Sequence, residues 1–321
     1  MEAANRTDDF DNTHVLPLTI SLGVIGILGN GLVCVTIYRA RFMHNPTNYL
    51  IIHLAFADLL VCSTQVAFQD SFFPDTKSMF LCIFFSREIL VWFSILLSSM
   101  GIMSVTIERY LAIVHPLHYP RYSTPRRLWL AVAGMWFSAT VFSALHVVLP
   151  SQDLAQTDCL FPGKLGLHSP VIRAGVAINS FMYLCPMSCL FYCYFKIILN
   201  LRRGAHRQRR DRNHAPANEL LGAQRRVAVV LAIVATAYII LWLPVLLGNV
   251  FITLDVGSAN EFLFKMFRWT TILPVINSII NPVIYAFKYK EFQRGVKEAV
   301  LPWCFNRRHR VATANDVIAL G

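Results

Sequence analysis

Seven long apolar runs, separated by short polar segments, dominate this sequence. Each run has at least about 20 residues, the length that an α-helix needs to cross a hydrocarbon core of ~30 Å. The chain is 55% hydrophobic and 15% charged, whereas soluble domains have about 45–50% apolar and about 25% charged residues. We therefore expect an all-α membrane protein, a seven-transmembrane helix bundle with runs at residues 16–38, 48–68, 80–107, 128–149, 171–199, 227–254 and 262–287.

The basic residues indicate how the bundle is oriented. With these seven spans, 7 of the 29 lysine and arginine residues fall on the N-terminal side of the membrane and the other 22 on the opposite side. Positive charge marks the cytoplasmic side, so we expect a multi-pass protein with an extracellular N-terminus and a cytoplasmic C-terminus. The net charge of +11 then reflects topology and contact with membrane lipid, and not nucleic-acid binding.

The extracellular N-terminus, residues 1–15, is polar and acidic, so no cleavable signal peptide is expected before the first span. Asn5 begins a glycosylation sequon on this outer side, although such sequons also match by chance. Cys82 and Cys159 are the two cysteines expected near the outer surface, an oxidising setting, and we expect a disulfide between them.

The seven-helix domain spans residues 16–287, and a basic, mobile inner loop is expected at 201–225. Residues 288–300 follow the last run, with Phe287, Phe292 and Val296 expected on one face and basic residues between them. That pattern predicts a short amphipathic helix on the inner membrane surface.

A cytoplasmic tail, residues 301–321, ends the chain, and Cys304 within it is a candidate for palmitoylation. Cys185, Cys189 and Cys193 form a stripe at helical spacing in the fifth run. A metal site is one interpretation of this stripe, but small buried apolar side chains explain it better, because no acid or histidine accompanies them.

Polar residues inside the apolar runs are costly in lipid and therefore suggest function. The deepest is Asp58, and the others are Asn30, Ser98, Asn277, Ser278 and Asn281, with Glu108 and Arg109 lower down. Asp58 either accepts hydrogen bonds from Asn30 and Asn281 to fasten helices, or forms a hydrated cation or proton site. Pro186, Pro244 and Pro282 lie deep in the last three runs and predict kinks.

These motifs together resemble those of a class A (rhodopsin-like) G-protein-coupled receptor over about residues 15–305. One motif falls in each expected span, in order, which makes the resemblance specific. They are GNGLV with Asn30, LAFAD with Asp58, ERY at 108–110, Trp136, Pro186 with Tyr194, LWLP at 241–244, and NSIINPVIY at 277–285 followed by Phe292.

The resemblance implies a plasma-membrane receptor that binds an extracellular ligand and activates a heterotrimeric G protein, with arrestin and receptor kinases as further partners and no enzymatic activity. It implies a sodium pocket, with sodium as an allosteric modulator and no other cofactor, at Asp58, Ser98, Asn277 and Asn281. The implied activation switches are Glu108, Arg109, Tyr110, Tyr194, Tyr238, Trp242, Pro244, Pro282 and Tyr285, with Pro244 as the hinge of an outward tilt of helix six.

The sequence also departs from the family pattern. Cys82 lies two residues farther before Arg109 than is usual, which shifts the register of the upper part of helix three. Ser99 and Tyr238 replace a branched aliphatic residue and a phenylalanine, and we expect a hydrogen bond between them. The acid that commonly restrains the arginine from helix six is Gln224 here. Because a neutral hydrogen bond is weaker than a charged one, we expect appreciable basal activity.

The ligand class follows less directly. The Schiff-base lysine of retinal-binding members is Val275 here, and the aspartate of amine receptors is Val91. A mostly apolar pocket with a few amides and one acid is typical of a peptide or small neutral ligand. Acids outnumber bases on the outer surface, which favours a basic peptide, although solvated loop charge explains the excess almost as well. The candidate pocket residues are Gln65, Glu88, Val91, Trp92, Ile95, Asn179, Val245, Asn249, Phe267 and Thr271.

Other functional classes have less support from the sequence. A receptor without a ligand, active constitutively or as a heterodimer partner, stays open as an alternative. A seven-helix transporter, channel or pump is disfavoured, because Asp58 is the one acid expected deep in the membrane. An enzyme is disfavoured because the sequence shows no metal-binding motif and no nucleophile with a base nearby.

Overall fold

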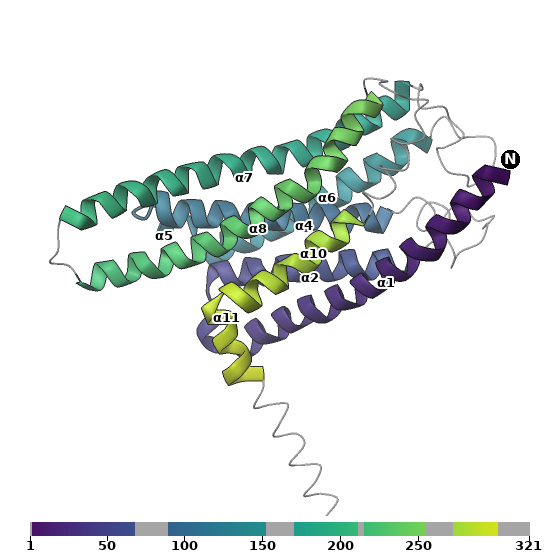
Figure 1. Ribbon diagram of the computed structural model, residues 1–321. Coiled ribbons are helices and arrows are strands. Elements are labelled where there is room, and N and C mark those ends of the chain that lie inside the picture. The colour runs from purple at the N-terminus through teal and green to yellow at the C-terminus, as the bar shows by residue number, and fades with distance from the viewer. Residues whose placement is uncertain (1, 68–88, 152–169, 211–214, 254–271, 301–321) are drawn as a thin grey trace, which may run out of the picture.

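The computed structural model describes all residues except 1, 68–88, 152–169, 211–214, 254–271 and 301–321 (Figure 1). The described residues form helices and short connections, without any strand among them. In chain order the helices are α1 (Glu2–Arg39), η1 (Arg41–Met43), α2 (Pro46–Ala67), α4 (Ile89–Val114), α5 (Tyr119–Tyr122), α6 (Pro125–Ser151), α7 (Pro170–Arg210), α8 (Ala215–Thr253), α10 (Leu273–Lys288), α11 (Lys290–Gly295) and η6 (Val296–Val300).

The predicted spans correspond to α1, α2, α4, α6, α7, α8 and α10. Within the described residues, six segments are long and apolar enough to cross a membrane, namely Pro17–Arg39, Pro46–Ala67, Ile89–Val114, Pro125–Leu145, Ser180–Arg203 and Arg225–Phe251. The seventh predicted run is described from Ile272 onward and forms α10. The N-terminus and α11 lie at opposite ends of the bundle (Figure 1), which an odd number of crossings requires.

Helix α4 is the central element of the bundle. It contacts α2, α6, α7 and α8, and 61% of the residues in its most apolar stretch are buried. Helix α6 lies at the periphery, with 17% of its most apolar stretch buried. The large apolar side chains that α6 exposes, such as Phe137, have lipid as their natural surrounding. The functional side chains described below therefore converge on α4 from its neighbours.

Helix α1 packs against α2 and α10 through small residues. A Cβ atom added at Gly26 would lie 2.3 Å from Cys62 Sγ on α2 and 3.2 Å from Ile279 Cγ1 on α10. Only a glycine permits this approach, which is common where membrane helices pack closely. α1 thereby packs against both α2 and α10, the second and last spans of the bundle.

The two long helices α7 and α8 extend as a pair past the rest of the bundle, at the end that carries α5 (Figure 1). α7 continues to Arg210 and α8 begins at Ala215. The loop expected at 201–225 is therefore helical over most of its length, which the sequence prediction missed. Its arginine, alanine, glutamine and leucine residues are strong helix formers. The many charged residues among them suit a solvated helix as well as a loop.

A break at Tyr289 separates α10 from α11. The Tyr289 backbone is extended, with φ −95° and ψ 97°, so α11 leaves the bundle in a new direction. Phe292 is buried and Val296 partly buried, as the amphipathic prediction requires, but Phe287 is 75% exposed. Phe287 belongs to α10, before the break, and therefore does not share the buried face of α11.

The three predicted helix-breaking prolines lie where the sequence placed them. Pro186, Pro244 and Pro282 are each inside a helix, in α7, α8 and α10 respectively. Each removes one backbone hydrogen bond from its helix. Helices α7, α8 and α10 therefore each have a weakened point.

Candidate functional site

The adjacent residues Glu108 and Arg109 form an ion pair near the C-terminal end of α4. Arg109 Nε lies 2.6 Å from Glu108 Oε2, and Arg109 Nη2 lies 2.8 Å from Glu108 Oε1. Both side chains are largely buried, with 13% of the arginine and 9% of the glutamate side chain exposed. Two parallel hydrogen bonds between a guanidinium and a carboxylate are the strongest geometry available to this pair.

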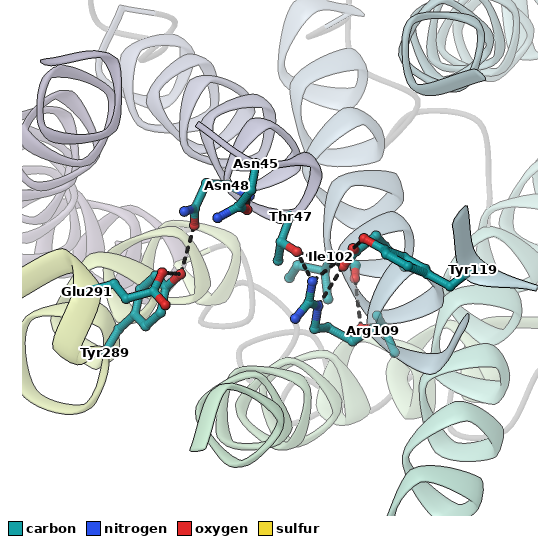
Figure 2. A network of polar contacts seen from close by, with 10 residues as sticks. Asn45, Thr47, Asn48, Ile102, Arg109, Tyr119, Tyr289 and Glu291 are labelled. Atoms are coloured by element: carbon teal, nitrogen blue, oxygen red, sulfur yellow. Dashed lines mark hydrogen bonds and ion pairs between the residues drawn. The ribbon is translucent and has the colours of Figure 1, made fainter. Parts of the chain in front are cut away.

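Two further donors reach Glu108 from outside α4 (Figure 2). Thr47 Oγ1 on α2 donates to Oε2 across 3.0 Å, and the Tyr119 hydroxyl on α5 donates to Oε1 across 2.5 Å. Arg109 Nη2 also donates to Thr47 Oγ1. A carboxylate has about four acceptor positions, so Glu108 is fully occupied. The pair expected from the ERY motif is thus held by two neighbouring elements that the sequence did not reveal.

Tyr119 stays a hydrogen-bond donor at neutral pH. Burial and the hydrogen bond to the Glu108 carboxylate both raise the pKa of Tyr119 above its ordinary value. The phenol therefore remains protonated through the physiological range. Tyr110, the last residue of the motif, points elsewhere, because its hydroxyl lies 3.1 Å from His115 Nε2.

A second polar group joins α2 to α11 (Figure 2). The Tyr289 hydroxyl donates toward Asn48 Oδ1 at 2.8 Å and Glu291 Oε2 at 2.9 Å. The Asn48 amide is held in this orientation because its Nδ2 donates to Met43 O across 2.8 Å. Sequence reasoning missed this group. The sequence feature that could have revealed it is Tyr289, which lies two residues past the seventh run and four residues after the NSIINPVIY motif.

Asp58 on α2 is fully buried at the centre of the bundle and accepts three hydrogen bonds. Ser98 Oγ donates to Oδ1 across 2.6 Å, Ser278 Oγ donates to Oδ1 across 2.9 Å, and Asn281 Nδ2 donates to Oδ2 across 2.6 Å. These donors come from α4 and α10, so the carboxylate joins three helices. All three donors are neutral, and a buried carboxylate with neutral partners favours a proton or a cation nearby.

One sequence prediction about this cluster, a bond from Asn30 to Asp58, needs correction, whereas the sodium pocket with Asn277 stays a prediction. Among the described residues, Asp58 accepts from Ser278 and not from Asn277, which is one residue away and therefore turned about 100° around the helix. Asn30 does not reach Asp58 but donates from Nδ2 to Gly26 O and Ser278 O, each across 3.0 Å. Asn30 thus supports the cluster through the α10 backbone.

An aromatic stack surrounds Trp242 on α8. The Tyr183 ring of α7 lies 4.4 Å from the Trp242 ring at an interplanar angle of 23°, and the Tyr238 ring lies 6.0 Å away. Ser99 lies beside the buried Tyr238 hydroxyl, as expected, but their contact is not a well-aligned hydrogen bond, because Ser99 Oγ donates to Ile95 O across 3.0 Å. A serine inside a helix satisfies its hydroxyl most simply on the carbonyl four residues earlier.

The hydroxyls of Tyr194 on α7 and Tyr285 on α10 are buried. Tyr194 lies beside Thr106 without a well-aligned hydrogen bond, and the Tyr285 hydroxyl has no partner among the described residues. An unpaired buried hydroxyl costs about 1–3 kcal/mol. Such groups gain free energy from any rearrangement that gives them a partner. Their location fits the activation switches implied by the sequence motifs.

Comparison with known proteins identifies the family. The sequence model of the family described as "7 transmembrane receptor (rhodopsin family)" matches residues 29–285. The chain belongs to this family. The receptor is 25% identical over 301 residues to mouse (Mus musculus) trace amine-associated receptor 9. This match covers 88% of this chain and 84% of the mouse receptor. It is 26% identical to rat (Rattus norvegicus) neuromedin-U receptor 2, in a match that covers 92% of this chain and 78% of the rat receptor.

The fold of the receptor also matches a solved structure. Squid rhodopsin superposes with a TM-score of 0.69 at 17% sequence identity, and the match covers 91% of this chain and 85% of the rhodopsin chain. The seven-helix bundle predicted from the sequence is thereby confirmed. A member of this family is a receptor and not an enzyme, as the sequence predicted.

The receptor's described pocket residues face the bundle interior at the outer half of the helices. Val91, Ile95, Val245 and Asn249 are buried, while Gln65 and Trp92 are partly buried. Val91 on α4 is 4% exposed, so the position that carries an aspartate in amine receptors lies in the interior here without a charge.

Several predicted positions lie outside the described residues of the receptor. They are Glu88, Phe267 and Thr271 of the pocket, the cysteines Cys82 and Cys159, and Cys304. Asn5, Asn179 and Gln224 lie in the helices α1, α7 and α8, but their side chains are not described. The disulfide, the glycosylation and the palmitoylation stay predictions.

The three cysteines of the stripe on α7 become more buried along the helix. Cys185 is exposed, Cys189 is partly buried and Cys193 is buried. The described residues contain no group of three histidine, cysteine or acidic side chains arranged to hold a metal ion. The prediction of small buried side chains holds for Cys193 and not for Cys185.

Proposed function

We propose that the protein is a plasma-membrane receptor that binds an extracellular ligand and activates a heterotrimeric G protein when α8 tilts outward. The observation that carries this proposal is the occupied Glu108 carboxylate, which holds Arg109 against α2 and α5. Arg109 becomes available to a partner only when it leaves Glu108 and Thr47, and an outward tilt of α8 would open space beside it. Pro244 inside α8 supplies a weak point for that movement.

The buried tyrosines support the same movement. Among the described residues, the buried Tyr285 hydroxyl has no partner in this conformation, and that of Tyr194 has only poorly aligned contact with Thr106. A rearranged bundle that pairs them, directly or through water, recovers part of the cost of breaking the ion pair. Arrestin and receptor kinases are proposed as further partners at the same cytoplasmic end, with the N-terminus outside the cell.

The Asp58 cluster is proposed as an allosteric sodium site of the resting receptor. Its oxygen ligands would be the carboxylate of Asp58, the hydroxyls of Ser98 and Ser278 and the carbonyl of Asn281. A hard cation prefers such oxygen donors, and the full burial of an acid with neutral partners supports the fit. A bound cation would stabilise the conformation in which α2, α4 and α10 converge.

A peptide is the ligand class that we propose. Val91 is buried without a charge, so a ligand ammonium group has no acid at the position that amine receptors use. An amine ligand is the second candidate, because one relative is named a trace amine-associated receptor, and it requires an acid elsewhere in the pocket. The name of another relative, a neuromedin-U receptor, does not decide between the two.

The test is nucleotide exchange on a panel of purified G proteins, using the full chain in nanodiscs and a library of peptides and amines. We expect ligand-dependent exchange that is lost in Arg109→Ala while ligand binding persists. Exchange that Arg109→Ala leaves intact would exclude the proposed role of the ion pair. Solute flux across vesicles without any exchange would instead identify a transporter.

A further inference from the structure

A cavity of about 310 Å³ opens at the cytoplasmic end between α2, α4, α5 and α6. Small-molecule sites have volumes of about 300–1,000 Å³, so the cavity suits one small ligand or one lipid chain. Its lining includes no residue of α8 and none of the candidate ligand pocket, so the two sites are separate. Neither the family comparison nor the proposed signalling route assigns it a role.

The walls of this cavity are mainly apolar. Leu50 of α2, Leu111 of α4 and Leu128 of α6 line three of its sides. Ile107 and Ala131 complete the apolar surface. These side chains offer dispersion contacts and no hydrogen bonds, so the body of an occupant must be hydrocarbon.

The polar groups of the cavity determine the head of an occupant. Glu108 lines the cavity, but Arg109, Thr47 and Tyr119 already fill its acceptor positions. It has no capacity left for a ligand cation or donor.

Arg127 is the cation of the lining, and it is under-used. Among the described residues it donates from Nη1 to Arg121 O across 2.8 Å, and its guanidinium lies 5.4 Å from the centroid of the Tyr122 ring. A guanidinium has five N–H donors, and the hydrogen bond to Arg121 O uses one of those on Arg127. Of the two charged side chains in the lining, only Arg127 therefore has hydrogen-bonding groups left, and these are N–H donors on a positively charged group. Such donors favour an occupant with an anionic head.

We propose that this cavity binds a single-chain anionic amphiphile, whose anionic head pairs with Arg127 and whose hydrocarbon chain lies between α4 and α6. A long-chain carboxylate has this chemistry, and so does one chain of an anionic phospholipid whose headgroup reaches Arg127. Both sources are available at the cytoplasmic membrane surface, and the experiment below separates them.

Occupancy has a consequence that rests on the proposed signalling function. Glu108 and Tyr119 form part of the cavity wall, so an occupant packs against the hydrogen bond that joins α5 to α4. It holds α5 in place, which keeps Glu108 fully coordinated and Arg109 paired. The amphiphile therefore lowers basal nucleotide exchange. Binding is measured without a G protein, so failure of the site and failure of the signalling proposal give different results.

The probe is a long-chain fatty acid that carries a photoreactive diazirine, added to the purified full chain in phosphatidylcholine nanodiscs. Cross-linked peptides are mapped by mass spectrometry. We expect labelling of α4, α5 and α6 around the cavity, with affinity reduced about tenfold in Arg127→Gln, the effect of losing one charge-assisted interaction. Ala131→Phe fills the cavity and should abolish the labelling.

The matched control is Arg126→Gln. Arg126 is the neighbouring exposed arginine and does not line the cavity, so its loss removes the same charge from the same surface. Labelling that falls equally in Arg126→Gln and Arg127→Gln would reduce the effect to general surface charge and overturn the proposal. Labelling that is unchanged in Arg127→Gln would also overturn it. Arg127 is exposed, so this variant should fold even if Ala131→Phe does not.

A second arm uses nanodiscs with photoreactive phosphatidic acid in place of the free fatty acid. Labelling of the cavity by this lipid assigns the site to the bilayer, and labelling by the fatty acid alone assigns it to a free amphiphile. Labelling by neither probe overturns the proposal. In parallel, saturating probe should lower basal nucleotide exchange of the wild-type receptor and not that of Arg127→Gln. Lower exchange in both would show that the probe acts elsewhere.

Discussion

Tyr119 on α5 donates its hydroxyl to Glu108 Oε1 on α4 across 2.5 Å, and this bond ties the short helix after the third span to the ion pair at its end. A hydrogen bond to a charged acceptor contributes about 1.5–3 kcal/mol, so loss of half of it shifts a two-state equilibrium about threefold or more. We expect Tyr119→Phe to raise basal nucleotide exchange by that factor. Tyr38→Phe, at a tyrosine on α1 that is 78% exposed, is the control. Basal exchange in Tyr119→Phe equal to the control would contradict the restraint.

The cytoplasmic end of α8 gives a second prediction about basal activity. Among the described residues, Arg109 pairs with Glu108 and Thr47 and with no residue of α8. Gln224 occupies the position from which related receptors restrain the arginine with an acid. A charged hydrogen bond is about twice as strong as a neutral one, so Gln224→Glu should lower basal exchange. Gln224→Ala serves as the comparison, and a Glu variant as active as the parent would count against this idea.

The Asp58 cluster predicts which residues make the receptor sensitive to sodium. A cation that binds only the folded receptor stabilises it by mass action. We expect the thermal unfolding temperature to rise in sodium chloride relative to choline chloride, and we expect Asp58→Asn and Ser278→Ala to reduce this rise. Asn277→Ala should leave most of it, because Ser278 and not Asn277 contacts the carboxylate. The reverse order of the two α10 variants would restore the original sequence prediction.

The Tyr289 hydroxyl has one proton and two acceptors, Asn48 Oδ1 and Glu291 Oε2. Tyr289→Phe removes the link between α2 and α11 and should lower stability by about 1 kcal/mol. Glu291→Gln should be neutral or stabilising, because a glutamine amide can donate to the phenol oxygen while Tyr289 donates to Asn48. Burial and the Glu291 carboxylate raise the pKa of Tyr289, so its proton is present at neutral pH. Thermal unfolding and hydrogen exchange of α11 are the measurements, and equal losses in both variants would refute this account.

Two glycines of α1 offer a matched pair for helix packing. Gly26→Ala places a Cβ 2.3 Å from Cys62 Sγ, whereas nothing lies within 4 Å of a Cβ at Gly31. Overpacking costs about 1–3 kcal/mol, so Gly26→Ala should lower the unfolding temperature. Gly31→Ala should raise it slightly, since alanine has the higher helix propensity. The combination Gly26→Ala with Cys62→Ala should recover part of the loss. Equal effects of the two single variants would show that α1 does not pack as described.

The sequence predicted the spans, the prolines and the buried Asp58, Glu108 and Arg109, since apolar length and charge within an apolar run are local properties of the chain. It missed Thr47, Tyr119 and the group around Tyr289. It did not predict the α7 and α8 extensions, because polar helix formers suit a solvated helix and a loop equally well. Phe287 was placed on the wrong face because a helical count passes through the Tyr289 break without detecting it.

The sequence by itself determined that this chain is a seven-helix receptor and that Asp58, Glu108 and Arg109 require partners inside it. Only the tertiary structure decided which partners they have. Ser278 in place of Asn277, Thr47 and Tyr119 on Glu108, and Asn48 on Tyr289 all come from other helices. The choice depends on how each helix is rotated about its axis, where one residue of register turns a side chain by about 100°. Packing against neighbouring helices sets that rotation, and spacing along the chain cannot encode it.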